Sequence, residues 1–332
     1  MKPTMNTKGF LVLIVLIVAI VFVVLTFSEV SHIEDMLAMV GKGGKDRLNS
    51  QITQAQSDNE LIALSKCLAH TSDFDRTEVC WTTYKRTQMR KVLDMMDAMP
   101  REETIHFSTL ASHSPHQLLI PTHQCDMLKL QRMGPNAYTD NPKGRHPDGP
   151  KWMCPEYLVT PDDTPCAVFS IGSNGDFQFE ESIHKFVGDK CKIYTFDCTG
   201  TWSNPVTEFH PWCISDVDKV EEGRQFRTLT TMMKDVGVKE IHLFKIDVEG
   251  FEFNALRTLQ KVDKEALPRQ MLVEVHFGAP HSFKTFNGDV ETWVKPATDF
   301  YRAIDTLGYS IALRERNIYS DCCAEYILIK NP

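Results

Sequence analysis

Two carboxylates stand at the end of an apolar run in IHLFKIDVEGFEF, residues 241–253. An unpaired carboxylate in an apolar interior costs several kcal/mol, so Asp247 and Glu249 are expected at a rim where a strand ends and ligand can enter. Gly250 breaks the strand, and the period of two is expected to turn both carboxylates to one side. Glu252 follows in the first helical turn, where its charge suits the helix dipole.

A glycine-containing loop, SIGSNGD at 170–176, follows another apolar run and opens a helix. Gly172 permits a tight turn with close approach of a ligand, and Gly175 relieves crowding at the helix start. The spacing G-x-x-G differs from G-x-G-x-x-G, which disfavours pyrophosphate binding. Asp176 can pair with an ammonium group, so the loop indicates a cofactor with an amino-acid moiety. The alternative is an ordinary strand-to-helix turn.

A third acidic position, Asp197, ends the apolar segment KIYTFD. A carboxylate at the end of the second strand can accept hydrogen bonds from both ribose hydroxyls of a nucleoside. Alone, it is equally consistent with a helix cap. Together with the glycine loop, it indicates an adenosine-containing cofactor lying across the strand ends.

Alternating short apolar runs and helical stretches must position these residues. Strands are expected at 166–171, 192–197, 241–247, 270–277, 309–317 and 325–331, with helices at 177–187, 220–237, 251–262 and 290–308. This order predicts an α/β fold with a doubly wound, mostly parallel sheet, in which ligands bind at the carboxyl ends of the strands.

The chain before this domain divides by composition. Apolar spacing predicts two helices within 60–99, separated near 71–75, and the Pro- and His-rich stretch that follows suggests an irregular covering element stapled by a Cys125–Cys154 bridge. We therefore expect a stem at 28–58, a helical and loop-rich covering region at 59–165, and the main domain at 166–332.

The motifs SIGSNGD, YTFD and LFKIDVEGFE, in this order, resemble a class I S-adenosylmethionine-dependent methyltransferase. LFKIDVEGFE is similar to the K-I-D-x-E-G-x-E signature of the FkbM-like branch. DGPKWMC at 148–154 and HPWCIS at 210–215 resemble the eukaryotic methyltransferase-like domain family, which is often found behind a signal or anchor. The resemblance covers about residues 120–330 and departs from the common pattern at Ser170, where an acid is frequent.

The resemblance implies S-adenosylmethionine as the cofactor and assigns its contacts. Asp197 would hold the ribose, Ser215 would lie near the adenine, Asp247 would face the sulfonium and Glu249 the acceptor. The expected contacts of the methionine part are Gly172, Ser173, Asn174 and Gly175, with Asp176 behind them. FkbM-type enzymes methylate hydroxyls, often on sugars, so the expected partner is a hydroxyl-bearing acceptor such as a glycan.

A hydroxyl acceptor must lose its proton as the methyl group transfers. His276, in VEVHFG, is the expected base, with Glu249 or Asp247 as its partner, and these three are the predicted catalytic residues. A hydrogen-bonded core histidine is the alternative. Another alternative is a divalent metal held by the same three residues; we predict no metal. Holding the reactants in line supplies much of the rate even without a base.

The N-terminus carries an uncharged segment, FLVLIVLIVAIVFVVLTF at 10–27. At 1.5 Å per residue it would span about 27 Å, close to the hydrocarbon thickness of a bilayer. Lys2 and Lys8 precede it, so residues 1–9 are expected in the cytoplasm and the rest in the lumen. This predicts a signal-anchor and a type II membrane protein, with the Golgi as the expected compartment. The alternative is a cleaved signal peptide and secretion.

The ten cysteines agree with a lumenal location, since disulfides form there. The net charge of −8, without a dense basic block, argues against a nucleic-acid partner. Two other functions remain open: a methyltransferase for proteins or small metabolites, and a catalytically inactive methyltransferase fold that serves as an interaction module.

Overall fold

The computed structural model describes residues 62–67, 74–98, 119, 121–123, 125–126, 128–135, 150–158, 166–277, 295–317 and 322–331. The predicted anchor at 10–27 and the predicted stem at 28–58 lie outside these residues, as does most of the Pro- and His-rich stretch. In the part of the chain that is described, no helix combines the length and the apolar character needed to cross a membrane.

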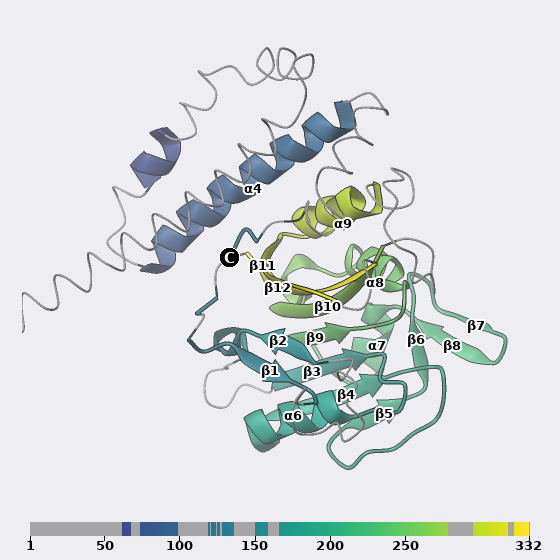
Figure 1. The fold of residues 1–332 in the computed structure, drawn as a ribbon. Coiled ribbons are helices and arrows are strands. Elements are labelled where there is room, and N and C mark those ends of the chain that lie inside the picture. The colour runs from purple at the N-terminus through teal and green to yellow at the C-terminus, as the bar shows by residue number, and fades with distance from the viewer. Residues whose placement is uncertain are drawn as a thin grey trace, which may run out of the picture. The chain divides into compact units, whose positions relative to one another are not determined.

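A seven-stranded sheet occupies the centre of residues 60–332, in the order β11-β12-β10-β9-β3-β4-β5 (Figure 1). Its strands are β3 (Cys166–Ile171), β4 (Cys191–Phe196), β5 (Glu208–His210), β9 (Leu243–Ile246), β10 (Gln270–His276), β11 (Tyr309–Arg316) and β12 (Cys323–Lys330). Adjacent strands from β10 to β5 are parallel, whereas β12 is antiparallel to β10 and β11. The predicted mostly parallel sheet is confirmed.

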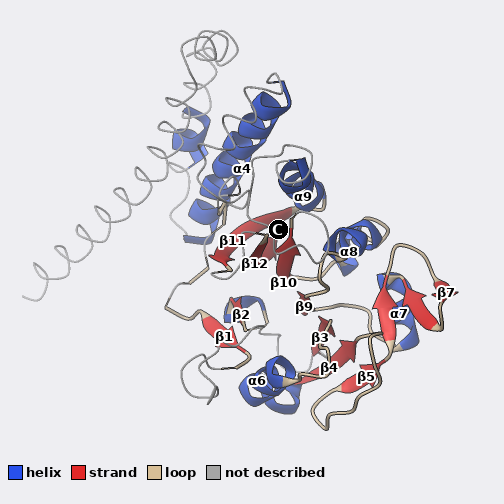
Figure 2. Ribbon diagram, turned by 45° about the vertical axis from the view of Figure 1, so that its right-hand side comes forward, coloured by secondary structure: helices blue, strands red, loops and turns tan. Residues whose placement is uncertain are grey.

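The central strands are apolar because both faces of the sheet are covered. On one face, α6 (Gln178–Val187) and a two-stranded ribbon, β1 (Gln131–Met133) and β2 (Lys151–Met153), pack on a shared core. On the other side lie α7 (Leu229–Asp235) and α8 (Glu252–Leu259), as Figure 2 shows. α9 (Lys295–Thr306) also contacts the sheet there, through Phe300 against Tyr326. Helices on both faces confirm the doubly wound arrangement.

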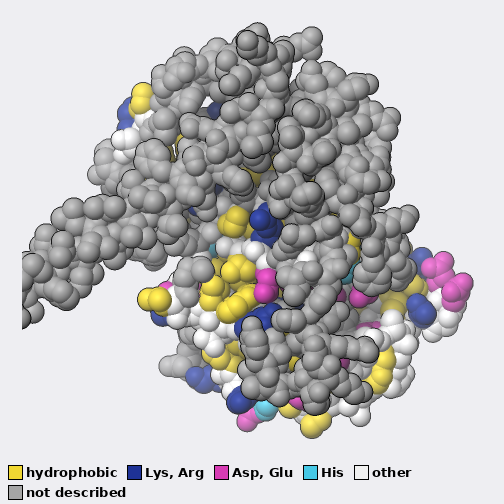
Figure 3. Space-filling view, in the orientation of Figure 1, with side chains coloured by type: hydrophobic (Ala, Val, Ile, Leu, Met, Phe, Trp, Pro, Cys, Tyr) yellow, Lys and Arg dark blue, Asp and Glu magenta, His cyan; other side chains and the backbone are white. Residues whose placement is uncertain are grey.

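The helix predicted over 220–237 is wrong in its first half. That stretch forms β7 (Lys219–Glu221) and β8 (Arg224–Arg227), which join β6 (Trp212–Ile214) in a separate sheet of order β6-β8-β7. Glu222 and Gly223 both have positive φ, 49° and 77°, as a two-residue hairpin turn requires. The helix begins only after Thr228, whose side chain accepts a hydrogen bond from the backbone N–H of Thr231. Charged side chains gather at the end of this hairpin (Figure 3).

The two helices predicted within 60–99 are present at 62–67 and as α4 (Phe74–Ala98). α4 is attached to α9 by ion pairs, because Arg86 and Arg90 both contact the carboxylate of Asp305. Arg90 binds both oxygens of Asp305, and Arg86 donates twice to Oδ1, so with Asp305 partly buried this is more than a solvated surface pair.

All ten cysteines are paired, as Cys67–Cys80, Cys125–Cys154, Cys166–Cys191, Cys198–Cys213 and Cys322–Cys323. The predicted Cys125–Cys154 bridge is confirmed. It joins the segment before β1 to the end of β2, and so it closes the ribbon that covers one face of the sheet.

Candidate active site

A row of polar side chains crosses the sheet beside the carboxyl ends of its parallel strands. Each member lies two positions from an apolar core residue of its own strand, so alternation places all of them on the face that the β1–β2 ribbon covers. The row consists of Ser170, Lys245, Glu274 and Glu325, beside the core residues Val168, Leu243, Leu272 and Ile327. The sheet thus changes from apolar to polar where a ligand is expected.

The glycine loop follows β3 directly and is held closely against the end of β9. Gly172 has φ 83°, and a Cβ there would lie 1.8 Å from the carbonyl oxygen of Asp247. Only glycine fits such an approach. Lys245 donates from Nζ to the Gly172 carbonyl oxygen, which connects the loop to the strand that carries Asp247.

Gly175 meets a second constraint, from a side chain that the sequence did not indicate. Its φ is 75°, and an added Cβ would lie 2.6 Å from Nε1 of Trp202. Trp202 belongs to the segment after β4 and contacts Phe209 edge-on. An indole therefore lies against the glycine loop at the side of β4.

Asp197 ends β4 as predicted, but its carboxylate is occupied by protein donors. Oδ2 accepts from the backbone N–H groups of Ser173 (2.8 Å) and Asn174 (2.6 Å). Oδ1 accepts from the backbone N–H and the hydroxyl of Thr199. Four donors use the lone-pair sites that a carboxylate offers, so Asp197 organises the glycine loop in this conformation. Its binding to a ribose stays a prediction and requires some of these contacts to change.

Asp176 and Ser215 lie at the margins of this region. Asp176 is exposed and accepts hydrogen bonds from the backbone and side chain of Gln178 at the start of α6. Ser215 is buried just after β6, where its N–H donates to the carbonyl of Arg227 in β8. It belongs to the small sheet, not the central one, and its predicted place near adenine stays a prediction.

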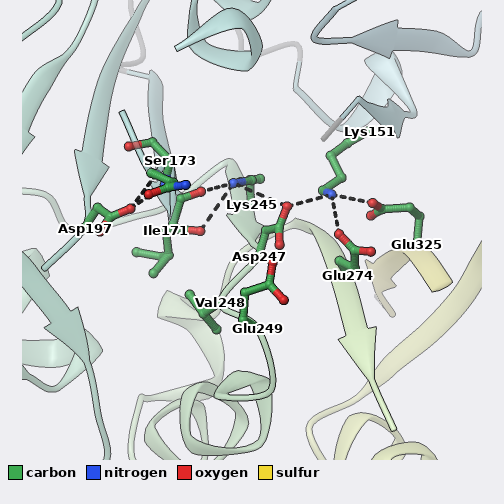
Figure 4. A network of polar contacts seen from close by, with 12 residues as sticks. Lys151, Ile171, Ser173, Asp197, Lys245, Asp247, Val248, Glu249, Glu274 and Glu325 are labelled. Atoms are coloured by element: carbon green, nitrogen blue, oxygen red, sulfur yellow. Dashed lines mark hydrogen bonds and ion pairs between the residues drawn. The ribbon is translucent and has the colours of Figure 1, made fainter. Parts of the chain in front are cut away.

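Asp247 lies just beyond β9 between two lysines. Nζ of Lys151 is 3.0 Å from Oδ2 of Asp247, and Nζ of Lys245 is 3.9 Å from the same oxygen (Figure 4). Burial raises the pKa of Asp247, but the charges of Lys151 and then Lys245 outweigh it and hold this pKa well below its usual range. Asp247 is therefore ionised at every pH at which the protein would work.

Glu249 reaches the site by a turn and not by strand alternation, because β9 ends at Ile246. Glu249 has φ 53° and Gly250 has φ 100°, which reverse the chain before α8. Oε1 of Glu252 stabilises this turn by accepting from the N–H groups of Val248 (3.3 Å) and Gly250 (3.0 Å). Glu249 is left 64% exposed, whereas Glu252 is fully buried.

His276, at the end of β10, lies between these two glutamates. Nδ1 is 3.0 Å from Oε1 of Glu252, and Nε2 is 3.5 Å from Oε2 of Glu249. Burial lowers the pKa of His276, but the hydrogen bond and charge of Glu252 outweigh it, with Glu274 and Asp247 adding to the effect, and raise this pKa to about 9. The structure thus brings the three predicted catalytic residues together and gives His276 an orienting partner, Glu252, that differs from the two expected.

Asp247, Glu249 and His276 each offer a ligand atom within 4.8 Å of the others, as a metal site would. The contact of Nδ1 with Glu252 leaves Nε2 as the ring nitrogen that faces Glu249. A carboxylate on the other nitrogen is also usual for a metal-bound histidine, and binding an ion would require Nε2 to give up its proton. The absence of a metal therefore stays a prediction.

Several residues of this site were not singled out from the sequence. Lys151 lies inside DGPKWMC, which was noted only as a resemblance, and Glu274 and Glu325 lie inside runs that were recognised as strands. A charged residue within a buried strand is the signal that was available for the last two. Nothing local indicated that all three would meet.

The residues present fit the cationic part of S-adenosylmethionine. Asp247 is an ionised carboxylate at the strand end, and it directly adjoins a glycine loop that has no room for side chains. An anionic group beside a close-approach loop is the donor set that a sulfonium next to an amino-acid moiety needs.

Three solved structures are similar to this chain, with TM-scores too low to carry an argument about it. A fibrillarin pre-rRNA processing protein of Methanococcus jannaschii is 11% identical, with a TM-score of 0.32 over 52% of this chain and 69% of its own. A 1,6-didemethyltoxoflavin-N1-methyltransferase of Burkholderia thailandensis, solved with S-adenosylhomocysteine, is 10% identical, with a TM-score of 0.30 over 51% of this chain and 72% of its own. A SAM-dependent methyltransferase from Aquifex aeolicus is 12% identical, with a TM-score of 0.26 over 49% of this chain and 82% of its own. Values of this size support no inference about a substrate.

Comparison with curated proteins found no match. The model of one family, described as a methyltransferase domain, matches residues 92–330. The match spans the β1–β2 ribbon, the glycine loop, Asp247 and His276, and it extends to the end of β12. The chain therefore belongs to the methyltransferase-domain family and is an S-adenosylmethionine-dependent methyltransferase.

Proposed function

We propose that this enzyme is an FkbM-like O-methyltransferase that methylates a hydroxyl of a glycan in the lumen of the secretory pathway. The observation that carries the proposal is the arrangement of His276. A buried carboxylate, Glu252, holds Nδ1, so that Nε2 is directed to the exposed side of the site, where Glu249 lies. A ring held in this way can receive a proton at one defined nitrogen.

The bound cofactor supplies a methyl group on a positively charged sulfonium. Asp247 provides a fixed negative charge for that end of the site. Nε2 of His276 accepts the proton that the acceptor hydroxyl loses as its oxygen–carbon bond forms, and Glu252 stabilises the resulting imidazolium. Because the pKa of His276 is about 9, the proton-accepting form is scarce at neutral pH, and the rate should rise as the pH approaches 9.

The cysteine pairs support the proposed location. Five disulfides join all ten cysteines of the chain. Cytosolic proteins seldom carry such a set, because cellular thiols keep cysteines reduced. The apolar segment at 10–27 would anchor the chain as a type II membrane protein of the Golgi. Protease protection in sealed vesicles and the N-terminal sequence of the mature chain test this placement: a mature chain that begins near residue 28 or later would mean a cleaved signal and a secreted enzyme.

The reaction is tested with the detergent-solubilised full chain and methyl-labelled S-adenosylmethionine. Neutral oligosaccharides, a denatured protein and small hydroxylated metabolites serve as acceptors in parallel. We expect label in the oligosaccharide as an alkali-stable ether. Label in an alkali-labile ester, in an amine or only in the protein would contradict the proposal. Failure to bind either S-adenosylmethionine or S-adenosylhomocysteine would contradict catalysis itself.

A matched pair of histidine variants separates the loss of the proposed base from the effect of replacing any histidine. His276→Gln removes the proposed proton acceptor and should reduce the transfer rate by about a hundredfold or more. His184→Gln changes a partly buried histidine near the end of α6 and should leave the rate unchanged. Equal activity of both variants would show that His276 is only a core residue.

A further inference from the structure

Lys151 is a buried cation among three carboxylates. Its side chain is 1% exposed, and Nζ contacts Asp247 (3.0 Å), Glu274 (3.3 Å) and Glu325, as Figure 4 shows. The acids come from the end of β9, from β10 and from β12, whereas Lys151 comes from β2 of the covering ribbon. The lysine thus joins two parts of the chain at the candidate active site.

The acids require this cation. Glu274 and Glu325 are directly opposite each other in the antiparallel β10–β12 pair, where like charges destabilise a sheet. Burial lowers the pKa of Lys151, but the charges of Asp247, Glu325 and Glu274 outweigh it and raise this pKa well above its ordinary value. Burial also raises the pKa of Glu325, against the opposing effect of Lys151. Of these two acids, Glu325 is therefore the one that takes up a proton more readily, whereas Asp247 stays ionised.

The backbone around Lys151 is held independently of the charge cluster. Lys151 pairs with Met133 in the β1–β2 ribbon. Just beyond β2, the side chain of Gln270 accepts from the N–H of Cys154 (2.7 Å) and donates to its carbonyl oxygen (3.0 Å). The Cys125–Cys154 disulfide secures the same point. The backbone that carries Lys151 is therefore in place before any ligand binds, and the three carboxylates then hold Nζ, as the positioning of a catalytic group demands.

Both lysines beside Asp247 contact the same oxygen. Nζ of Lys151 and Nζ of Lys245 lie 3.0 Å and 3.9 Å from Oδ2. Lys245 also donates to the carbonyl of Gly172 in the glycine loop, so its charge serves both this carbonyl and Asp247. Lys151 makes the shorter of the two contacts with Oδ2 of Asp247. Oδ1 is the oxygen that these two lysines leave available.

We propose that Lys151 is a positioning residue for methyl transfer: through its ion pair with Oδ2 of Asp247, it keeps this carboxylate both charged and oriented, with Oδ1 presented to the cationic methyl donor. The inference rests on the proposed place of Asp247 beside the sulfonium. It makes the covering ribbon a part of the active centre and not only a lid on the core.

The experiment compares the binding of S-adenosylmethionine, a sulfonium cation, with that of S-adenosylhomocysteine, its neutral thioether, by calorimetry on the solubilised full chain. The ratio of the two dissociation constants isolates what the sulfonium charge contributes, because the rest of the two ligands is the same. In the wild type, Asp247 is ionised throughout, and His276 keeps its proton below about pH 8. Glu325, whose pKa burial raises, contacts Lys151 and not Asp247, so the ratio should change little from about pH 5.5 to 8.

Lys151→Met should make this ratio depend on pH. Without the lysine, Asp247, Glu274 and Glu325 must share protons. Among the residues that the structure describes, Lys245 and His276 are then the cations that act on Asp247. The preference for the sulfonium should fall about tenfold at pH 5.5 and recover at pH 8. Lys151→Arg keeps the charge and should keep the ratio constant. Lys192→Met, at an exposed ion pair near the start of β4, is the matched control and should behave as the wild type.

Should Lys151→Met fail to fold, the double variant Lys151→Met/Glu325→Gln removes one buried acid together with the lysine, and the ratio is measured on it instead. A constant ratio, equal to that of the wild type, in the folded variant would overturn the proposal and leave Lys151 a purely structural residue. The acceptor is not needed for this measurement. Wild-type protein that binds both ligands but methylates no hydroxyl would refute the proposed function alone, whereas wild type that binds neither ligand refutes both.

Discussion

Replacing Glu252 by glutamine should lower the pKa of His276 and shift both activity and stability on the pH axis. Glu252 is fully buried, and its Oε1 lies 3.0 Å from Nδ1 of His276. Glutamine keeps the size and an oxygen for the N–H groups of Val248 and Gly250, but it removes the negative charge. Burial of the ring, which lowers the pKa, then acts with less opposition.

The size of the effect follows from the pKa. A fall from about 9 to the ordinary value of 6.5 or lower corresponds to about 3 kcal/mol of interaction between imidazolium and carboxylate. Because folding raises the pKa of His276, this stabilisation is complete below about pH 6.5 and is lost as the pH rises through 9. Glu252→Gln should therefore be less stable than the wild type by about 3 kcal/mol at pH 6, and the difference should narrow as the pH rises from about 6.5 to 9.

Exchange of the imidazole C2 proton, followed by mass spectrometry, measures the pKa of His276, and urea unfolding at several pH values measures stability. With a pKa of about 9, roughly one wild-type molecule in a hundred has a neutral ring at pH 7, so the rate rise of the variant should begin at lower pH. Glu249→Gln is the matched control: Glu249 is 3.5 Å from Nε2 and 64% exposed, so its loss should change the pKa little. Titration of wild-type His276 near 6.5, or the same pKa in Glu252→Gln, would refute this reasoning.

Three other changes have definite expected outcomes. Gly172→Ala should abolish cofactor binding in calorimetry, because its Cβ would lie 1.8 Å from a backbone oxygen. Gly188→Ala, with open space around a positive φ, should bind normally after a loss of about 1–3 kcal/mol of stability. Binding by Gly172→Ala would contradict the close approach. Replacing Cys125 and Cys154 by serine should cost about 3 kcal/mol in urea unfolding, and an unchanged midpoint would count against the closed ribbon. Burial lowers the pKa of His242, so the folded state resists protonation of this ring, and the free energy of unfolding should fall as the pH drops below about 6.5. His242→Gln should flatten this pH dependence in urea unfolding. An unchanged slope of the free energy of unfolding against pH would exclude His242 as its source.

The predicted fold agreed with the structure where the signal was local. Strand and helix order, the parallel sheet and the glycine loop follow from side-chain periodicity and from turn residues that act over a few positions. The failure at 220–237 is also local in origin. Two consecutive residues with positive φ, Glu222 and Gly223, form a hairpin inside a stretch whose composition resembles a helix, and pairing with both β6 and β7 stabilises the strand that follows.

The sequence by itself determined which residues could carry chemistry: Asp247 and Glu249 at a strand end, His276 at the next, and Asp197 after the glycine loop. Only the tertiary structure decided what each of them contacts. Lys151 meets Asp247, Glu274 and Glu325 across 96, 123 and 174 positions of the chain, and Glu252, expected to serve a helix start, holds the histidine. The charge state of a buried group depends on neighbours that are distant in the sequence and that strand order and register bring together. No local pattern in the sequence predicts which residues these neighbours are.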